Sequence, residues 1–333
     1  MSVEVTEYFE STVMPMIRNR HSEVLPEMSV MILGSVGLGI DDELSDMEAA
    51  VYLNDLVWKK SGGQLQLSLN DCLFETNPWR KDGSVISVYP LSWLLDGHAK
   101  KFLTDASDLP WESVSFETLF TMQESLIFYD PQRTLQRLRE STAPSRRPEH
   151  LWKKSLLLEF NKLVVEDLSD IKKSVMRNRM AEAHILLGHV LEGLIHIGFL
   201  IFHKYYPWRT HLRWAFDKLP MLSSRFGSDI DLILTTVDWY KKIEIIEVVI
   251  DAYKNFITLN ALLPEIDIWS DDLNKELMWG ERLKAWETPN WRSRITNCTK
   301  KALESGCASY QFWVWSLWGW VNEKPNKSMD NKE

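Results

Sequence analysis

The sequence predicts an α+β protein in which a small domain with a mixed sheet precedes an all-helical domain. Three apolar runs of strand length, 30–33, 49–53 and 84–89, lie in the first third of the chain. Beyond them, apolar residues recur at helical spacing to near the end of the sequence. A polar stretch with two prolines, 141–149, interrupts the helical part and marks the expected domain boundary.

The first domain, residues 1–140, begins with a helical pattern over residues 5–22. The run 30–33 is predicted to be a buried strand, because it is wholly apolar and ends abruptly at Gly34. Apolar content or alternation predicts further strands at 49–53, 64–69 and 84–89. Helices are then expected at 91–104, 114–129 and 131–139.

The second domain, residues 141–321, is expected to contain helices only. Their predicted positions are 150–175, 179–204, 208–217, 229–262, 271–286 and 295–321. The polar tail 322–333 is expected to be disordered.

Composition restricts the class of partner. The chain has 333 residues, of which 47 are acidic and 38 basic, so its net charge of -9 disfavours a nucleic-acid partner. Three scattered cysteines without a zinc-site spacing and a start without a secretory pattern predict a cytoplasmic protein. The apolar passage 185–202 contains glycine, histidine and glutamate, so it is expected to be a buried helix and no membrane partner is predicted.

A Gly-Ser pair and two acids carry the predicted chemistry. Gly34-Ser35 ends the first strand, and Asp46-x-Glu48 follows ten residues later at the start of the second. Residues i and i+2 of a strand share a face, so Asp46 and Glu48 are expected to present their carboxylates side by side. Carboxylate oxygens bind Mg²⁺, and one or two such ions also bind a triphosphate. An ordinary loop with two solvated acids is the alternative interpretation.

The loop between these residues is expected to hold phosphates. Glycines such as Gly34 and Gly37 let backbone N–H groups approach a triphosphate closely. The hydroxyls of Ser35 and Ser45 are further candidates for nucleotide binding.

These motifs resemble those of the polymerase-β-like nucleotidyltransferase superfamily, whose signature is Gly-Ser followed by Asp-x-Asp or Asp-x-Glu. The Asp-x-Glu form is similar to that of the kanamycin (aminoglycoside) nucleotidyltransferases, and Tyr129-Asp130-Pro131 resembles a step after their catalytic domain. Arg177-Asn178-Arg179 and Tyr205-Tyr206-Pro207 resemble segments of uncharacterised nucleotidyltransferase-fold proteins with a helical C-terminal domain.

This resemblance implies transfer of a nucleoside monophosphate, AMP from ATP, to a hydroxyl of a small molecule such as an antibiotic or natural product. Two Mg²⁺ ions and pyrophosphate release are implied with it. In the helical domain, Asp170 or Glu166 is the implied base, and Lys173, Arg177 and Arg179 are implied to bind phosphates. The alternative for these five residues is a solvated helix face with ion pairs.

The motif departs from the superfamily pattern at the third strand acid, because 84–89 contains none. Either two strand acids suffice, or Asp71 or Asp82 replaces the third, or activity is lost. Two rival functions follow: an antitoxin-like enzyme that modifies a protein partner, and a non-catalytic nucleotide-binding or interaction protein.

Three other patterns are left with structural interpretations. His189, His196 and His203 repeat every seven residues, which fits a satisfied row on one helix better than a zinc site. The pair Arg179 and His184 resembles the short motif of helical ribonucleases, a match that arises easily by chance. The tryptophan-rich segment 312–320 fits a helix core or a homodimer contact, with ligand stacking as the alternative.

Overall fold

The chain divides into two compact units, each described by itself. The computed structural model describes residues 2–76, 83–104, 109–219, 222–260 and 262. The first unit holds the described residues up to 147 together with 205–212, and the second holds 148–204 and the described residues from 213 onward. The helices predicted at 271–286 and 295–321, the tryptophan-rich segment and the predicted disordered tail lie outside the described residues.

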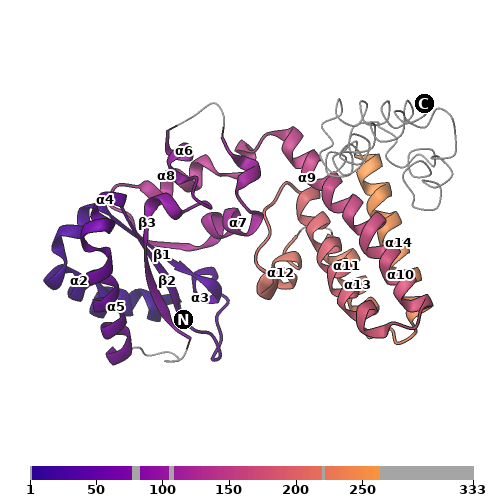
Figure 1. Cartoon of the computed structure of the whole chain (residues 1–333), viewed down its shortest axis with the longest axis horizontal. Helices are drawn as coiled ribbons and strands as arrows, with labels where there is room; N and C mark the ends of the chain where they lie inside the picture. The colour runs from indigo at the N-terminus through magenta and orange to yellow at the C-terminus, as the bar shows by residue number, and fades with distance from the viewer. Residues whose placement is uncertain (1, 77–82, 105–108, 220–221, 261, 263–333) are drawn as a thin grey trace, which may run out of the picture. The chain divides into compact units, whose positions relative to one another are not determined.

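The first unit is built on a four-stranded mixed sheet (Figure 1). Its strands are β1 Met28–Leu33, β2 Glu48–Leu53, β3 Val85–Pro90 and β4 Leu126–Tyr129. They lie in the order β3-β2-β1-β4, with β1 antiparallel to both β2 and β4, and with β2 parallel to β3. The predicted α+β class with a mixed sheet is confirmed.

The helices of the first unit precede, connect and follow the strands. Their bounds are α1 Ser2–Tyr8, α2 Met14–Arg20, α3 Gly34–Leu38, α4 Asp55–Val57, α5 Gly63–Thr76, α6 Ala99–Leu103, α7 Phe116–Glu124 and α8 Thr134–Ser141. A π-helical turn, Phe9–Val13, joins α1 to α2, so residues 5–20 form a nearly continuous helix as predicted.

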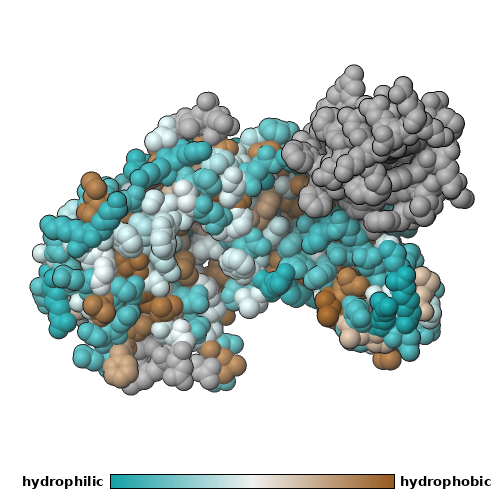
Figure 2. Space-filling view, viewed as in Figure 1, coloured by the Kyte–Doolittle hydropathy of each residue, from teal (hydrophilic) through white to brown (hydrophobic). Residues whose placement is uncertain are grey.

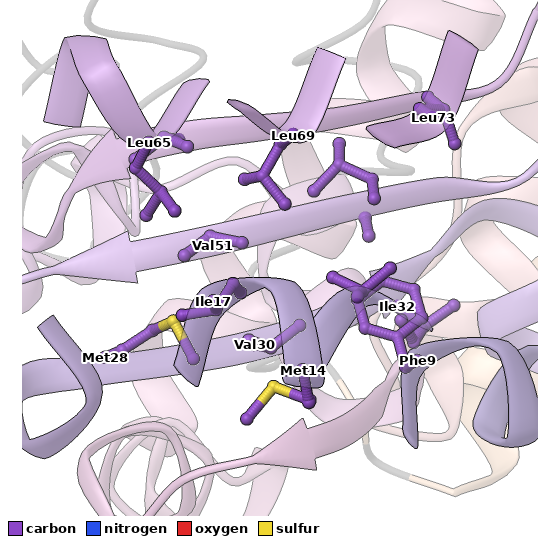
Figure 3. Close-up of a cluster of buried hydrophobic side chains, with 14 of the residues drawn as sticks. Phe9, Met14, Ile17, Met28, Val30, Ile32, Val51, Leu65, Leu69 and Leu73 are labelled. Carbon is purple, nitrogen blue, oxygen red and sulfur yellow. The ribbon is translucent and has the colours of Figure 1, made fainter. Parts of the chain in front are cut away.

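One face of the sheet carries the core of this unit. Side chains from the N-terminal helices and α5 gather on β1 and β2 (Figure 3). Phe9, Ile17, Val30, Val51 and Leu69 are completely buried there. Because side chains alternate along a strand, the neighbouring Met31 and Tyr52 belong to the opposite face, as does Glu48 at the start of β2. That opposite face holds the candidate site.

Three predictions in the first unit were wrong. The helix expected at 91–104 is a 3-10 turn, Leu91–Trp93, followed by the short helix α6, Ala99–Leu103. The alternating segment 64–69 is part of α5, because Leu65, Leu69 and Leu73 recur every four residues and are all buried. Leu65 and Leu69 fit one face of a strand or of a helix, whereas Leu67 between them is 65% exposed, as a helix requires. The predicted helix 114–129 ends at Glu124, where Ser125 takes an extended backbone and begins the path into β4.

Asp130, immediately after β4, connects three elements. Its carboxylate accepts hydrogen bonds from Ser29 Oγ in β1 at 2.8 Å, from Thr134 N at 2.8 Å and from Gln136 N at 2.9 Å. The last two are otherwise unsatisfied donors at the start of α8. The Tyr-Asp-Pro step therefore has a structural role, since it closes the sheet edge onto the next helix.

We expect Asp130→Ala to lower the free energy of unfolding by roughly 1–2 kcal/mol, because it leaves three donors without this acceptor. Urea unfolding followed by circular dichroism measures the change. Asp71→Ala, at an exposed position of α5, is the control and should change stability by less than about 0.5 kcal/mol. Equal stability of the two variants would contradict the capping role.

The second unit is helical throughout its described residues. Its helices are α9 Glu149–Asn161, α10 Leu168–Met176, α11 Met180–Ile201, α13 Leu222–Thr235 and α14 Trp239–Leu259, while α12 Arg209–Phe216 spans the point where the chain passes from the first unit to the second. A π-helical turn, Lys162–Asp167, joins α9 to α10. The single helix predicted at 229–262 is two helices, because Asp238 accepts a hydrogen bond from Lys241 N at 2.9 Å and begins α14 anew.

α11 has the length and composition of a membrane span, with a mean hydropathy of 1.6 over its most apolar window. In the described residues it is the one such helix, and 61% of that window is buried within the protein. Large apolar side chains are also exposed on both units, as brown atoms in Figure 2 show. Because folded proteins commonly expose such residues, they alone indicate no binding surface.

Three regularly spaced histidines, two in α11 and His203 two residues after its end, each lie near a carboxylate of the preceding segments. His189 Nδ1 lies 3.9 Å from Asp167 Oδ1, and His196 Nδ1 lies 3.1 Å from Glu159 Oε1. His203 Nδ1 lies 3.6 Å from a Glu149 oxygen, and its ring stacks on Trp152. This is the arrangement of a satisfied row of histidines along a helix contact. Burial raises the pKa of the Asp167 carboxyl above its usual value.

Candidate functional site

Gly34 lies where β1 ends, directly beside Glu48. Its neighbour Leu33 pairs with Glu48 in the β1–β2 ladder. Gly34 has φ +60°, in the left-handed region that favours glycine, and a Cβ built on it would lie 3.1 Å from Glu48 Oε2. The glycine therefore allows both the turn into α3 and the approach of this carboxylate.

Asp46 lies two residues before Glu48, next to the start of β3. A Cβ on Gly83 would lie under 3.0 Å from the Asp46 carboxylate, so Gly83 leaves the room that this side chain occupies. Met47 between the two acids is completely buried, and Val85 N donates a hydrogen bond to Met47 O at 2.8 Å. With Met47 directed into the core, Asp46 and Glu48 are placed on the opposite face. Asp46 is half-buried and Glu48 is exposed.

The other loop candidates are placed as follows. Ser35 is half-buried in the first turn of α3, one residue after Gly34. Gly37 faces β1, and a Cβ on it would collide with the Ile32 carbonyl oxygen. Gly37 thus has a packing reason to be glycine, in addition to the predicted phosphate role. The Ser45 hydroxyl donates to Asp42 Oδ1 at 3.0 Å and accepts from Asp42 N at 3.0 Å, which closes the turn before Asp46.

Hydrogen bonds in the turn formed by residues 42–45 lower the pKa of Asp42. The Ser45 hydroxyl and the Leu44 N–H both donate to the Asp42 carboxylate, and they hold the pKa of Asp42 below its usual value. Hydrogen bonds to the charged form are the largest cause. Asp42 is therefore expected to stay ionised and to keep the segment before Asp46 ordered.

Among the described residues, no third acid is seen beside Asp46 and Glu48. The β3 residues on the face of Glu48 are Val85, Ser87 and Tyr89, because Val85 pairs with Glu48 in register. Asp71 is exposed on α5, which packs on the other face, and Asp82 lies outside the described residues. In the described parts of the chain no group of three metal-binding side chains occurs. The described part of the chain therefore contributes two carboxylates to this site.

The candidates of the helical half lie in the second unit. Asp170 and Lys173 form an ion pair of 2.8 Å on α10, and both are substantially exposed. Glu166 is exposed in the π-helical turn, and Arg177 and Arg179 are exposed between α10 and α11. The i,i+3 ion pair is the solvated-face arrangement given above as the alternative. The base and phosphate-binding roles of these residues stay predictions.

A pocket that sequence reasoning missed lies on the same face of the sheet as Glu48. Its volume is about 270 Å³, and we call it the aromatic pocket. It is lined by Met31, Tyr52, Tyr89, Trp93, Leu94, Leu95, Asp96, Thr118, Thr121, Met122 and Trp208, all from the first unit. The signal in the sequence was the alternation of β2, which places Tyr52 four residues after Glu48 on one face.

Gly34 and Gly39 offer a matched test of the contact with Glu48. Both have positive φ, but a Cβ on Gly39 would meet nothing within 4 Å. We expect Gly34→Ala and Gly39→Ala each to cost about 1–2 kcal/mol of stability, because alanine is strained in this backbone region. Only Gly34→Ala should also displace Glu48 and weaken Mg²⁺-dependent ATP binding, measured by calorimetry. Equal weakening by both variants would show that the contact with Glu48 is unimportant.

Fold and site together define an α+β protein with two carboxylates beside a glycine turn. The family described as "Domain of unknown function (DUF4037)" matches residues 111–215. No curated protein matches the chain. Among solved structures, the chain is similar to a nucleotidyltransferase-like protein from Exiguobacterium sibiricum 255-15, with a TM-score of 0.39 and 13% identity over 74% of this chain and 76% of that chain. The likeness to that protein is distant in both sequence and structure.

Proposed function

We propose that this protein is a Mg²⁺-dependent nucleotidyltransferase that transfers AMP from ATP to a hydroxyl of a small molecule and releases pyrophosphate. The observation that carries the proposal is the position of Asp46 and Glu48. Glu48 lies next to the glycine turn that ends β1, and Asp46 lies against Gly83, two residues before Glu48 along the chain. An antibiotic or another hydroxylated natural product is the proposed acceptor.

The two carboxylates fit a magnesium site. Mg²⁺ prefers oxygen ligands and usually keeps several waters, so one or two carboxylates with phosphate oxygens satisfy it. Asp46 and Glu48 supply such oxygens without a lysine or arginine ion pair among the described residues. When bound, the metal supplies charge neutralisation of the phosphates.

The chain's own groups have separate tasks in this proposal. The Gly34-Ser35 backbone and the Ser35 hydroxyl bind phosphate oxygens, because the glycine admits a close approach. Asp46 and Glu48 would hold the Mg²⁺ ion, whose positive charge would be supplied to the phosphates. A base takes the proton of the acceptor hydroxyl, for which Asp170 is proposed first and Glu166 second. Lys173, Arg177 and Arg179 are proposed to bind the remaining phosphate charge.

Incubation with labelled ATP tests this function directly. The purified chain, Mg²⁺ and a panel of hydroxylated small molecules should give a labelled product and pyrophosphate in equal amounts. Chelation of the metal with EDTA should abolish both, because the two carboxylates are negatively charged and repel the triphosphate when no cation lies between them. ATP binding that is equally tight with and without Mg²⁺ would contradict the proposal.

Binding without turnover is the second candidate function, and the lack of an acid on β3 favours it. β3 offers Val85, Ser87 and Tyr89 where an acid is expected. Mg²⁺-dependent ATP binding without pyrophosphate release with any acceptor would support this candidate. An antitoxin-like transferase would instead co-purify with a protein partner whose mass increases by one nucleotide.

A further inference from the structure

The aromatic pocket lies along the strand that begins with Glu48. Tyr52 is four residues further on the same face of β2, which places it roughly 13 Å away at the usual rise of a strand. Tyr89 of β3 pairs with Tyr52, and Met31 of β1 pairs with Ala50 between Glu48 and Tyr52. The floor of the pocket is therefore the face of the sheet that carries the candidate site.

The aromatic walls of the pocket are fixed in place. Trp93 is 61% exposed, yet its ring lies 6.0 Å from that of Tyr89 and 6.1 Å from that of Trp58. Trp58 is in turn anchored, because its Nε1 donates to Val88 O at 3.2 Å. Trp208, also a lining residue, is 62% exposed. Two exposed tryptophans on a pocket are unusual for a purely structural role, and their rings are available to a ligand.

Asp96 adds a carboxylate to the wall. Its oxygens accept hydrogen bonds from Ser115 N at 2.8 Å and from Thr118 Oγ1 at 3.1 Å, and each oxygen has a further lone pair. Asp96 and Leu95 both have positive φ, 53° and 55°, a conformation that non-glycine residues rarely adopt. Leu95 is 1% exposed, so packing holds this strained backbone and directs Asp96.

The chemistry of the lining selects a cation. Four aromatic side chains line the pocket, aromatic rings attract ammonium groups through their π faces, and Asp96 adds a negative charge. Among the described lining residues there is no lysine or arginine to neutralise it. A volume of about 270 Å³ accommodates one ring with its substituents.

We propose that the aromatic pocket binds a small organic cation that carries a flat ring. Trp93 and Trp208 contact the ring and the ammonium group, and Asp96 accepts hydrogen bonds from that group. Where the proposed transferase activity holds, this cation is its acceptor, and that second assignment rests on the proposed function.

Calorimetry with tyramine and tyrosol tests the pocket without any catalysis. The two probes share a phenol ring, and tyrosol has a hydroxyl where tyramine has its ammonium group. We expect tyramine to bind, tyrosol to bind at least fivefold more weakly, and both Trp93→Ala and Asp96→Asn to raise the tyramine Kd about tenfold. Asparagine tolerates positive φ, so Asp96→Asn should keep the fold.

Two control variants distinguish loss of ligand binding from unfolding and from nonspecific surface effects. Trp93→Phe retains an aromatic ring and should keep the tyramine Kd within about threefold of the native value. Tyr240→Ala removes an exposed aromatic ring of the second unit and should leave it unchanged. Three results would each contradict the proposed cation binding. They are no tyramine binding, equal affinity for tyrosol, and a tyramine Kd within twofold of native in Trp93→Ala or Asp96→Asn.

Turnover separates this proposal from the function on which its second part rests. With Mg²⁺ and ATP, Trp93→Ala should raise the KM of a cationic acceptor about tenfold and change kcat little, because the ring binds the acceptor away from the reacting phosphate. An unchanged KM with transfer that still requires Asp46 would reject the acceptor assignment alone. Tyramine binding without transfer to any acceptor would reject the transferase and leave the cation site intact.

Discussion

Asp46→Asn is expected to reduce nucleotide transfer by about a thousandfold or more, because the amide loses the charge that holds Mg²⁺ against the triphosphate. Asparagine has nearly the same volume as aspartate, so the room left by Gly83 still accommodates the side chain. Pyrophosphate release with saturating Mg²⁺ and ATP measures the effect. The melting temperature should stay close to that of the native protein.

Glu43→Gln is the matched control for this variant. Glu43 is an exposed carboxylate three residues earlier, in the turn closed by Asp42 and Ser45. The same loss of one negative charge there should change transfer by less than twofold, since screening weakens distant exposed charges. Undiminished transfer by Asp46→Asn would contradict the proposed site. Equal losses in Asp46→Asn and Glu43→Gln would show that any lost negative charge lowers transfer, and that Asp46 has no specific role.

Gly37→Ala is expected to lower the free energy of unfolding by about 2–3 kcal/mol, the largest stability change foreseen for one added methyl group. The new Cβ would lie well under 3.0 Å from the Ile32 carbonyl oxygen, and backbone cannot move aside as a flexible side chain does. α3 would have to shift away from β1. Because α3 starts at Gly34, Mg²⁺-dependent ATP binding should weaken together with stability.

Gly63→Ala supplies the comparison for Gly37→Ala. Gly63 begins α5 with helical backbone angles, and a Cβ there would meet nothing within 4 Å. Alanine at such a position should be neutral or stabilise by about 0.4–1 kcal/mol, through the unfolded chain. Urea unfolding measures the free energy of unfolding of both variants. Similar values for Gly37→Ala and Gly63→Ala would mean that α3 tolerates the added methyl group.

Local patterns predicted much of the first unit. The apolar runs that form β1, β2 and β3 are short and end at turn residues. Both properties are local, so these strands could be predicted without tertiary information. The prediction of a strand at 64–69 was wrong because six residues are too few to show the helical spacing. Burial of Leu65 and Leu69 with Leu67 exposed shows that the segment is helical. β4 failed because its four half-buried residues continue a helical pattern, and pairing with β1 is a long-range event.

The candidate site was predictable only in part. The sequence spacing predicts that Gly34 and Glu48 lie close together, because β1 and β2 are adjacent antiparallel strands joined by one loop. The aromatic pocket was not predictable, since Tyr52, Tyr89, Trp93 and Trp208 come from separate segments that only the fold assembles. The ion pair of Asp170 with Lys173 was foreseen as the alternative for this helix face, because residues three apart on a helix are neighbours.

The return of residues 205–212 to the first unit makes that unit a discontinuous domain. Tyr205 donates a hydrogen bond to Thr142 O at 3.0 Å, and Trp208 lines the aromatic pocket, so this short segment completes a structure formed mainly by the first 147 residues. A protein fragment cut once after Arg147 would lack both contacts. Because the second unit resumes at residue 213, its evolutionary exchange would require three joining points, after residues 147, 204 and 212, so the two units are expected to be inherited together.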